Sequence, residues 1–137
     1  MNDPKTTATS GALRVAHRRY VPHAHAHYGG GLVDGAYALG LVGDLLTEAC
    51  IRLDRDEGLI ASYSDVQFRA PVRAGDVIEV SAELVARGNR SRTFAVQAHV
   101  ICRSDPTAGP SAAQVLDPPI VAMTAEAIVV VPDRGDG

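Results

Sequence analysis

The spacing of apolar residues changes along the chain, and each spacing predicts a different kind of element. Residues 13–21 alternate loosely between apolar and polar side chains, which predicts a short strand that ends at Pro22. Over residues 33–53, apolar side chains recur at every third or fourth position, namely at Leu39, Val42, Leu46, Ala49 (with Cys50) and Leu53. That spacing defines one face of a helix, and no proline interrupts it, so we expect one long helix here.

Beyond the helix, the apolar residues take the two-residue period of a strand with one solvated face. The alternation is clear over residues 77–87 and repeats over residues 93–103. Gly88, Asn89 and Arg90 lie between these segments and supply turn residues. We therefore expect an antiparallel hairpin.

Two further segments, residues 64–71 and 120–131, bring the expected number of strands to about five. Residues 104–119 contain four prolines and are expected to form a loop. A long helix and an antiparallel sheet bury their apolar faces against each other, so the expected fold class is α+β, with the sheet wrapped around one central helix. Such a sheet leaves open edges and uncovered apolar area in so short a chain, so we expect a homodimer.

The segments outside this pattern are polar. Residues 1–11 and 133–137 contain almost nothing to bury, and we expect both to be disordered tails. Residues 12–132 are expected to form a single domain, because a chain of 137 residues with 46% hydrophobic residues builds one core.

Charge and cysteine usage disfavour several classes of protein. A formal net charge of −3 provides no basic field for nucleic acid, so no nucleic-acid partner is expected. No apolar run is long enough to span a bilayer, and the first residues lack the apolar core of a signal peptide, so we expect a cytoplasmic protein without a membrane partner. Cys50 and Cys102 lie in apolar segments without metal-like spacing, and we interpret both as small core residues.

A loop rich in histidine and glycine, residues 23–31, leads into the predicted helix. Gly29, Gly30 and Gly31 allow the backbone to approach a ligand closely. The N–H groups at the start of a helix carry partial positive charge, which suits a developing oxyanion. The alternative interpretation is a flexible turn before a helix.

Several segments of the chain resemble those of hotdog-fold acyl-CoA proteins. They are residues 27–35 (His-Tyr-Gly-Gly-Gly-Leu-Val-Asp-Gly), the pair Gly43-Asp44 with Glu48, and residues 56–58, 66–76 and 88–92. The first of these segments with Asp44 and Glu48, together with residues 116–121, resembles the β-alanyl-CoA and 3-aminobutyryl-CoA ammonia lyases in particular. The resemblance covers roughly residues 13–132, and Gly31 departs from it, because asparagine is expected there in those lyases.

The resemblance implies the hotdog fold and an enzyme that reversibly eliminates ammonia from a 3-aminoacyl-CoA thioester to give a 2-enoyl-CoA. Its partners would be an acyl-CoA substrate and ammonia. No cofactor is expected beyond the coenzyme A that is part of the substrate. The resemblance also implies a hexamer made of three dimers.

Such an elimination needs a base for the α-proton, and the acidic residues near and along the helix are the candidates. Asp34 is expected in the first helical turn, where free N–H groups favour an ionised carboxylate; a capping role is the alternative. His27 is expected to shuttle the proton or to hydrogen-bond the thioester oxygen, with a structural role as the alternative. Asp44 and Glu48 lie about 15 and 21 Å beyond Asp34 along the helix axis, so they can join its site only across a dimer interface. Glu48 can instead pair with Arg52 on the helix surface.

Other residues are assigned to the thioester and to coenzyme A. The thioester oxygen is expected at the glycine-rich entry to the helix, which comprises Tyr28, Gly29, Gly30, Gly31 and Gly35. The phosphates and pantetheine are expected at the hairpin, which offers Asn89, Arg90, Ser91 and Arg92. Two more arginines are candidates on the same grounds, Arg69 and Arg73, and a merely solvated hairpin is the alternative.

Three other functions fit parts of the pattern. His23, His25 and His27 alternate, so in an extended chain their imidazoles would face one side and could bind zinc, nickel or copper in a small β-barrel. No second motif supplies further ligands, and we expect no metal site. A thioesterase would use the same carboxylate to activate water. A non-catalytic CoA-binding protein would keep the arginines but tolerate loss of Asp34.

Overall fold

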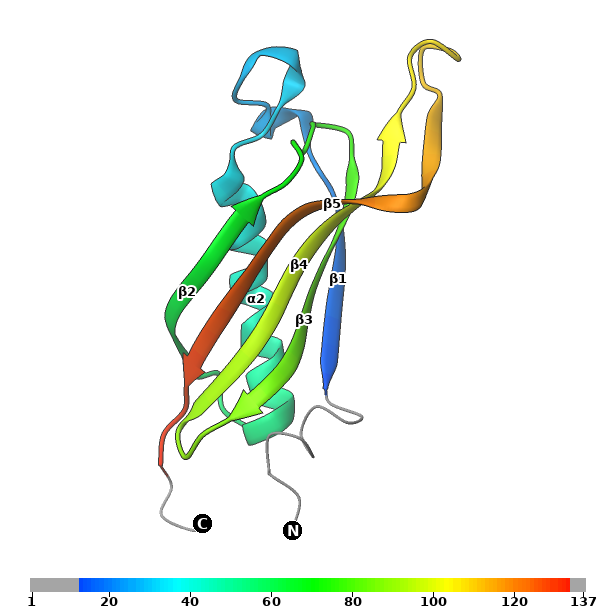
Figure 1. Ribbon diagram of the computed structural model, residues 1–137. Helices are drawn as coiled ribbons and strands as arrows, with labels where there is room; N and C mark the ends of the chain where they lie inside the picture. The colour runs from blue at the N-terminus through cyan, green and yellow to red at the C-terminus, as the bar shows by residue number, and fades with distance from the viewer. Residues whose placement is uncertain (1–12, 134–137) are drawn as a thin grey trace.

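One long helix packs across one face of a five-stranded antiparallel sheet in the computed structural model, which describes residues 13–133 (Figure 1). The helix is α2 (Gly35–Asp54), and two short 3₁₀ turns precede it, η1 (His23–His25) and η2 (Gly29–Gly31). The strands are β1 (Arg14–Tyr20), β2 (Leu59–Phe68), β3 (Val77–Arg87), β4 (Ser91–Ser104) and β5 (Ala113–Val130). They lie in the order β1-β3-β4-β5-β2. The expected α+β architecture with one central helix is confirmed.

The expected tails lie largely outside the described residues. Residues 1–11 and 134–137 belong to the part of the chain that the structure does not describe. Asp133, the first residue of the second expected tail, is exposed and follows the end of β5. Among the described residues, no helix combines the length and the apolarity needed to cross a membrane.

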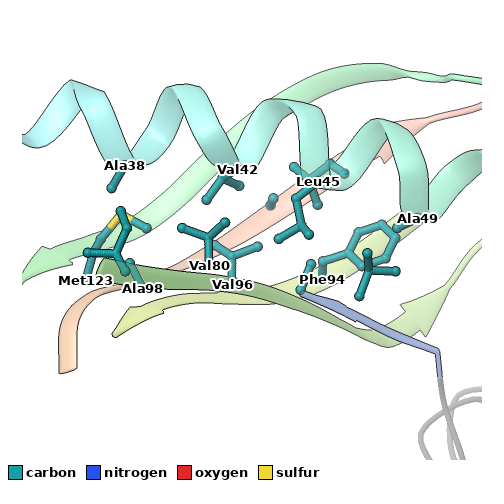
Figure 2. Packing of buried hydrophobic residues seen from close by; sticks show 14 of the residues in the cluster. Ala38, Val42, Leu45, Ala49, Val80, Phe94, Val96, Ala98 and Met123 are labelled. Atoms are coloured by element: carbon teal, nitrogen blue, oxygen red, sulfur yellow. The ribbon is translucent and has the colours of Figure 1, made fainter. Parts of the chain in front are cut away.

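The core lies between α2 and the concave face of the sheet. Figure 2 shows Val42, Leu45 and Ala49 of the helix pointing toward Val96 and Phe94 of β4. Each fully buried side chain of the size of Leu45 contributes about 1.5–3 kcal/mol of hydrophobic free energy. This packing fixes which helix face turns inward, and thereby places the start of α2 against the sheet.

The buried stripe of the helix differs in part from the expected one. Ala38 and Leu45 are buried, whereas Leu39 and Leu53 are only half-buried. The helical period of 3.6 residues aligns positions 38, 42, 45 and 49 along one side of the helix. That side faces the sheet over most of the length of the helix. Cys50 is fully buried as expected, and burial raises the pKa of its thiol to about 11.

The expected loop over residues 104–119 is wrong in extent, because the second half of it is strand. Beyond the main sheet, β4 and β5 continue as a two-stranded arm in which Cys102 pairs with Val115 and Ser104 with Ala113 (Figure 1). Between this arm and the sheet, Val100 pairs with Ile120, so residues 116–119 are an irregular stretch opposite a single residue of β4. Prolines are tolerated in such irregular stretches, because the ladder is already interrupted there.

Candidate functional site

Asp34 caps the N-terminus of α2 and lies on the walls of two neighbouring cavities. Its backbone is extended, and its Oδ1 accepts a hydrogen bond of 3.1 Å from the Tyr37 N–H. The residue is therefore one position before the expected first turn, and the capping role that was the alternative is correct. The cap engages one carboxylate oxygen, so the second oxygen of Asp34 is available for chemistry.

The first cavity, which we name the apolar cavity, has a volume of about 320 Å³. The start of α2 forms one wall, and the end of β2, the segment after it and β5 form the other. Most of its lining is apolar and includes Val33, Ala38, Phe68, Val72, Ala122 and Met123. A mainly apolar cavity with a few polar groups is typical of a small-molecule site. Asp34, Arg69 and Tyr37 are the residues that supply charge or a hydroxyl to its wall.

The second cavity, which we name the polar cavity, has a volume of about 360 Å³ and opens beside the histidine-rich segment. Its lining comprises Ala24, His25, Ala26, His27, Asp34, Ala36 and Tyr37. Asp34 and Tyr37 belong to both cavities. Asp34 and Tyr37 therefore lie between an apolar and a polar compartment.

The glycine-rich entry is held in a defined conformation, which argues against a flexible turn. Gly30 and Gly31 have φ angles of 76° and 73°, a region that glycine adopts without strain. The Ala74 N–H donates to the Gly31 carbonyl at 2.8 Å, and the Leu32 carbonyl accepts from the N–H of His27 and of Tyr28. A side chain on Gly29, Gly30 or Gly31 would meet no atom within 4 Å, so this backbone is open to a ligand.

Of the residues expected to bind the thioester, some line a cavity and others do not. Gly35 lines the apolar cavity, and its N–H begins α2 next to that of Ala36. N–H groups in the first helical turn lack partners within the helix, so they are suitable donors for a thioester oxygen. Tyr28 and the three glycines after it lie outside the lining of both cavities in this chain, so their role stays a prediction.

Within one chain, Asp44 and Glu48 lie apart from Asp34. Asp44 is exposed on the helix surface. Glu48 Oε1 lies 2.6 Å from His17 Nε2 of β1, and its Oε2 accepts from Arg52 Nε at 2.8 Å. The hydrogen bond with His17, followed by that from Arg52, lowers the pKa of the Glu48 carboxyl. The ion pair with Arg52 was the alternative interpretation, and His17 is a partner that sequence spacing did not reveal.

Arg92, which was expected to bind coenzyme A, forms an internal ion pair with Asp54 in the structure. Its side chain is 8% exposed and makes two hydrogen bonds with Asp54, at 2.9 and 2.8 Å. Its Nη1 also donates to the carbonyls of Gly88 and Ser91. These bonds join the C-terminal end of α2 to the β3–β4 hairpin, and they engage the Arg92 guanidinium within the protein.

The other residues of the hairpin are on the surface, but far from Asp34 of the same chain. Asn89 and Arg90 are exposed, Ser91 is half-buried, and Arg90 Nε donates to the Val131 carbonyl at 3.2 Å. The hairpin lies at the end of α2 opposite to Asp34 (Figure 1). A helix of 20 residues is about 30 Å long, so the hairpin and Asp34 of one chain lie at opposite ends of that length.

The two weaker arginine candidates lie at the Asp34 end of the molecule. Arg69 lines the apolar cavity, and its Nε donates to Thr124 Oγ1 at 3.3 Å. Arg73 is exposed next to the glycine-rich entry, with which its backbone forms a β-bridge at Leu32. The turn that carries Arg73 is held by the buried Asp76, which accepts two bonds from Arg103. That ion pair was not expected from the sequence.

The rings of the three alternating histidines contact three different tyrosines. The ring of His23 contacts Tyr20, that of His25 contacts Tyr37, and that of His27 contacts Tyr28. Within residues 13–133, no group of three or more His, Cys, Asp or Glu side chains is arranged to hold a metal ion. The sheet is also open, with β1 and β2 as its edges, so the alternative of a small metal-binding barrel does not describe this fold.

An open antiparallel sheet wrapped around one long helix, with cavities at the start of that helix, is a hotdog-fold arrangement. The family model of the thioesterase superfamily matches residues 30–101, just over half of the chain. A 3-aminobutyryl-CoA ammonia lyase of Acetoanaerobium sticklandii is 48% identical over 107 residues, which are 78% of this chain and 85% of that protein.

Solved structures agree with this assignment. The β-alanyl-CoA:ammonia lyase of Clostridium propionicum superposes with a TM-score of 0.82 at 31% identity, covering 88% of this chain and 86% of that one. A hexameric hotdog-fold thioesterase of Campylobacter jejuni superposes with a TM-score of 0.69 at 21% identity, covering 87% and 83%, and shares the fold. The chain belongs to the thioesterase superfamily, and within it to the family of the 3-aminobutyryl-CoA and β-alanyl-CoA ammonia lyases.

Sequence reasoning missed several residues of the cavities. Tyr37 is the most informative, because it follows Asp34 by three positions and therefore lies one turn further on the same side of the helix. That spacing was visible in the sequence. Phe68 and Met123 come from strands that are far apart in the chain, and no local pattern indicates that they meet.

Proposed function

We propose that the protein catalyses the reversible elimination of ammonia from a 3-aminoacyl-CoA thioester, giving a 2-enoyl-CoA. The observation that carries this proposal is the place of Asp34, a carboxylate at the start of α2 on the wall of an apolar cavity. A base and hydrogen-bond donors at one point are what removal of a proton next to a thioester requires. The membership of the ammonia-lyase family selects this reaction among those that the fold hosts.

In the proposed reaction, the thioester oxygen accepts hydrogen bonds from the first N–H groups of α2, at Gly35 and Ala36. These donors stabilise the negative charge that develops on the oxygen when the α-proton leaves. The free oxygen of Asp34 takes that proton. The electrons of the broken C–H bond form the new double bond, and the electrons of the C–N bond leave with the nitrogen. All these groups come from the protein, so we propose that no cofactor takes part besides the coenzyme A of the substrate.

The acyl chain is proposed to occupy the apolar cavity, between Phe68 and Met123. Arg69 on the same wall and Arg73 near the glycine-rich entry are then the proposed cationic partners of the coenzyme A within this chain. Guanidinium groups bind phosphates with two parallel hydrogen bonds, which suits this role.

We propose a homodimer as the functional unit, joined at the edge strand β2. In the described part of the chain, this strand has only β5 as a neighbour, and it exposes apolar side chains, with Leu59 79% and Phe68 57% exposed. An open apolar edge is a site for pairing with a second copy. Antiparallel pairing of the two β2 strands would bring the hairpin of one chain, with Arg90, toward Asp34 of the other. Action of Asp44 or Glu48 across a dimer interface is a separate proposal, because Glu48 is bonded to His17 of β1, at the sheet edge opposite to β2.

Assembly of three such dimers into a hexamer is a further proposal. The Campylobacter jejuni relative is described as hexameric, which supports it for this fold. Mass measurement in solution, with Phe68→Asp as the variant that introduces charge at the edge, tests the dimer and the hexamer together. A wild-type protein that elutes as a monomer would contradict both.

The decisive experiment mixes the protein with crotonyl-CoA and ammonium. Loss of the conjugated thioester absorbance without release of free thiol is expected for a lyase acting in the addition direction. Release of free thiol without addition of ammonia would instead identify a thioesterase. Binding of crotonyl-CoA with neither reaction would indicate a non-catalytic CoA-binding protein.

A further inference from the structure

The two cavities that meet at Asp34 offer different environments to a ligand. The apolar cavity presents aliphatic and aromatic side chains, Val33, Ala38, Phe68 and Met123 among them. The polar cavity presents two imidazoles and the Tyr37 side chain beside the shared carboxylate. A 3-aminoacyl group has the same division, because it combines an apolar carbon chain with a charged amino group on C3.

His25 and Tyr37 are held together and tied to Asp34. The two rings pack at a centroid distance of 4.9 Å with an angle of 48° between their planes. The Tyr37 N–H donates to Asp34 Oδ1 at 3.1 Å, so the backbone of the tyrosine is fixed by the residue whose carboxylate both cavities share. The capping hydrogen bond therefore joins Asp34 to a residue of the polar-cavity wall.

A departing amino group needs acceptors that an apolar wall cannot supply. An ammonium ion has only donors, whereas a carboxylate, a neutral imidazole and a tyrosine hydroxyl can all accept. An ammonium buried against Phe68 and Met123 would lose its hydration without compensation. The polar cavity, bounded by His25, His27 and Tyr37, is the compartment that meets this need.

We propose that the polar cavity is the ammonia site of the reaction, with Tyr37 and His25 as the residues that bind the nitrogen. This inference rests on the proposed lyase function and extends it. The C–N bond breaks, its electron pair leaves with the nitrogen, and neutral ammonia enters the polar cavity. Asp34, protonated by the α-proton, lies on the wall of the same cavity and transfers that proton to the ammonia. Ammonium then leaves, and the carboxylate is restored.

The test measures the addition of ammonium to crotonyl-CoA while each substrate is varied in turn. Tyr37→Phe removes only the hydroxyl, and His25→Gln removes the imidazole while keeping a polar side chain. We expect the KM for ammonium to rise by about tenfold in each variant, the effect of losing one hydrogen bond to a charged group. The KM for crotonyl-CoA is expected to change by less than about twofold, because the substitutions leave the binding of that substrate unaffected.

Matched controls are present in the chain. Tyr20→Phe and His99→Gln make the same changes at positions on β1 and β4 that line neither cavity, and both KM values should stay at the wild-type level. Circular dichroism of Tyr37→Phe and His25→Gln checks that both variants fold. If His25→Gln misfolds, Tyr37→Phe alone carries the test.

Two failures are distinguishable. Active variants with an unchanged KM for ammonium, or with both KM values raised equally, would overturn the ammonia site and leave the lyase function intact. A wild-type protein that adds no ammonia to crotonyl-CoA would overturn the proposed function, and the ammonia site with it.

Discussion

The ring of Phe68 lies directly over Gly35, so closely that a Cβ on the glycine would be 2.7 Å from both Cε1 and Cζ of the ring. Gly35 is the first residue of α2 and Phe68 is the last residue of β2, so this contact joins the two walls of the apolar cavity. Only a residue without a side chain fits beneath the ring as it stands. The conformation of Phe68, which is 57% exposed, therefore depends on Gly35.

Gly35→Ala is expected to displace the Phe68 ring and to raise the KM for crotonyl-CoA. The ring is the exposed end of a side chain and can rotate away, so the melting temperature should change little. Gly40→Ala is the matched control, because Gly40 also lies in α2 but has no atom within 4 Å of an added Cβ. It should stabilise the protein by about 0.5–1 kcal/mol through helix propensity and leave the KM unchanged. An unaltered KM in Gly35→Ala would show that Phe68 does not shape the acyl site.

Asp34→Asn is expected to lower kcat by about 10²- to 10⁴-fold, the usual contribution of a general base. Asparagine caps helices as well as aspartate does, so the melting temperature should be nearly unchanged. Asp34→Ala should lose both functions, with a destabilisation of about 1 kcal/mol from the missing cap. Thermal unfolding and steady-state kinetics of the two variants separate these roles. Normal turnover by Asp34→Asn would transfer the role of base to Asp44 or Glu48.

The Glu48 carboxyl is expected to make the stability of the protein depend on acidity. Its hydrogen bonds with His17 and Arg52 lower its pKa from the ordinary value of 4.5. A group whose pKa is lower in the folded state stabilises that state above the unfolded pKa, and this stabilisation is lost as the pH falls through the folded pKa. The melting temperature of Glu48→Gln should therefore lie below that of the wild type at pH 7 and approach it below pH 4.5.

The same variant tests whether Glu48 acts across the dimer interface. If its role is confined to the bonds with His17 and Arg52, Glu48→Gln keeps its turnover at neutral pH. A large fall in kcat with a small change in melting temperature would instead assign Glu48 to the site of the partner chain.

Arg92→Met is expected to destabilise the protein by about 3–5 kcal/mol, because it leaves the Asp54 carboxylate without its main partner in a largely buried place. The double variant Arg92→Met with Asp54→Leu removes both charges and should recover much of that loss. Arg90→Ala, two positions away and exposed, should change the free energy of unfolding by less than about 0.5 kcal/mol. Urea unfolding measures all three. An Arg92→Met protein as stable as the wild type would contradict the structural role of this ion pair.

The fold could be predicted largely from local pattern, because burial against one partner surface imposes a period on the sequence. The alternation over residues 77–87 matches β3 residue for residue, and the helix and Asp34 are within one or two positions of the expectation. The prolines near the β4–β5 arm predicted a loop where β5 begins, since proline excludes a regular ladder but not a strand with an irregular stretch in it.

The sequence by itself determined the secondary structure, the layering of one helix on a sheet, and the presence of a carboxylate and free N–H groups at one helix start. These depend on residues that are close together in the chain, where periodicity and capping act. Only the tertiary structure decided that Arg92 is bonded to Asp54, that Glu48 is bonded to His17, and that Asp34 separates an apolar from a polar cavity. Those relations join residues distant in sequence, and packing fixes them through contacts that leave no local pattern.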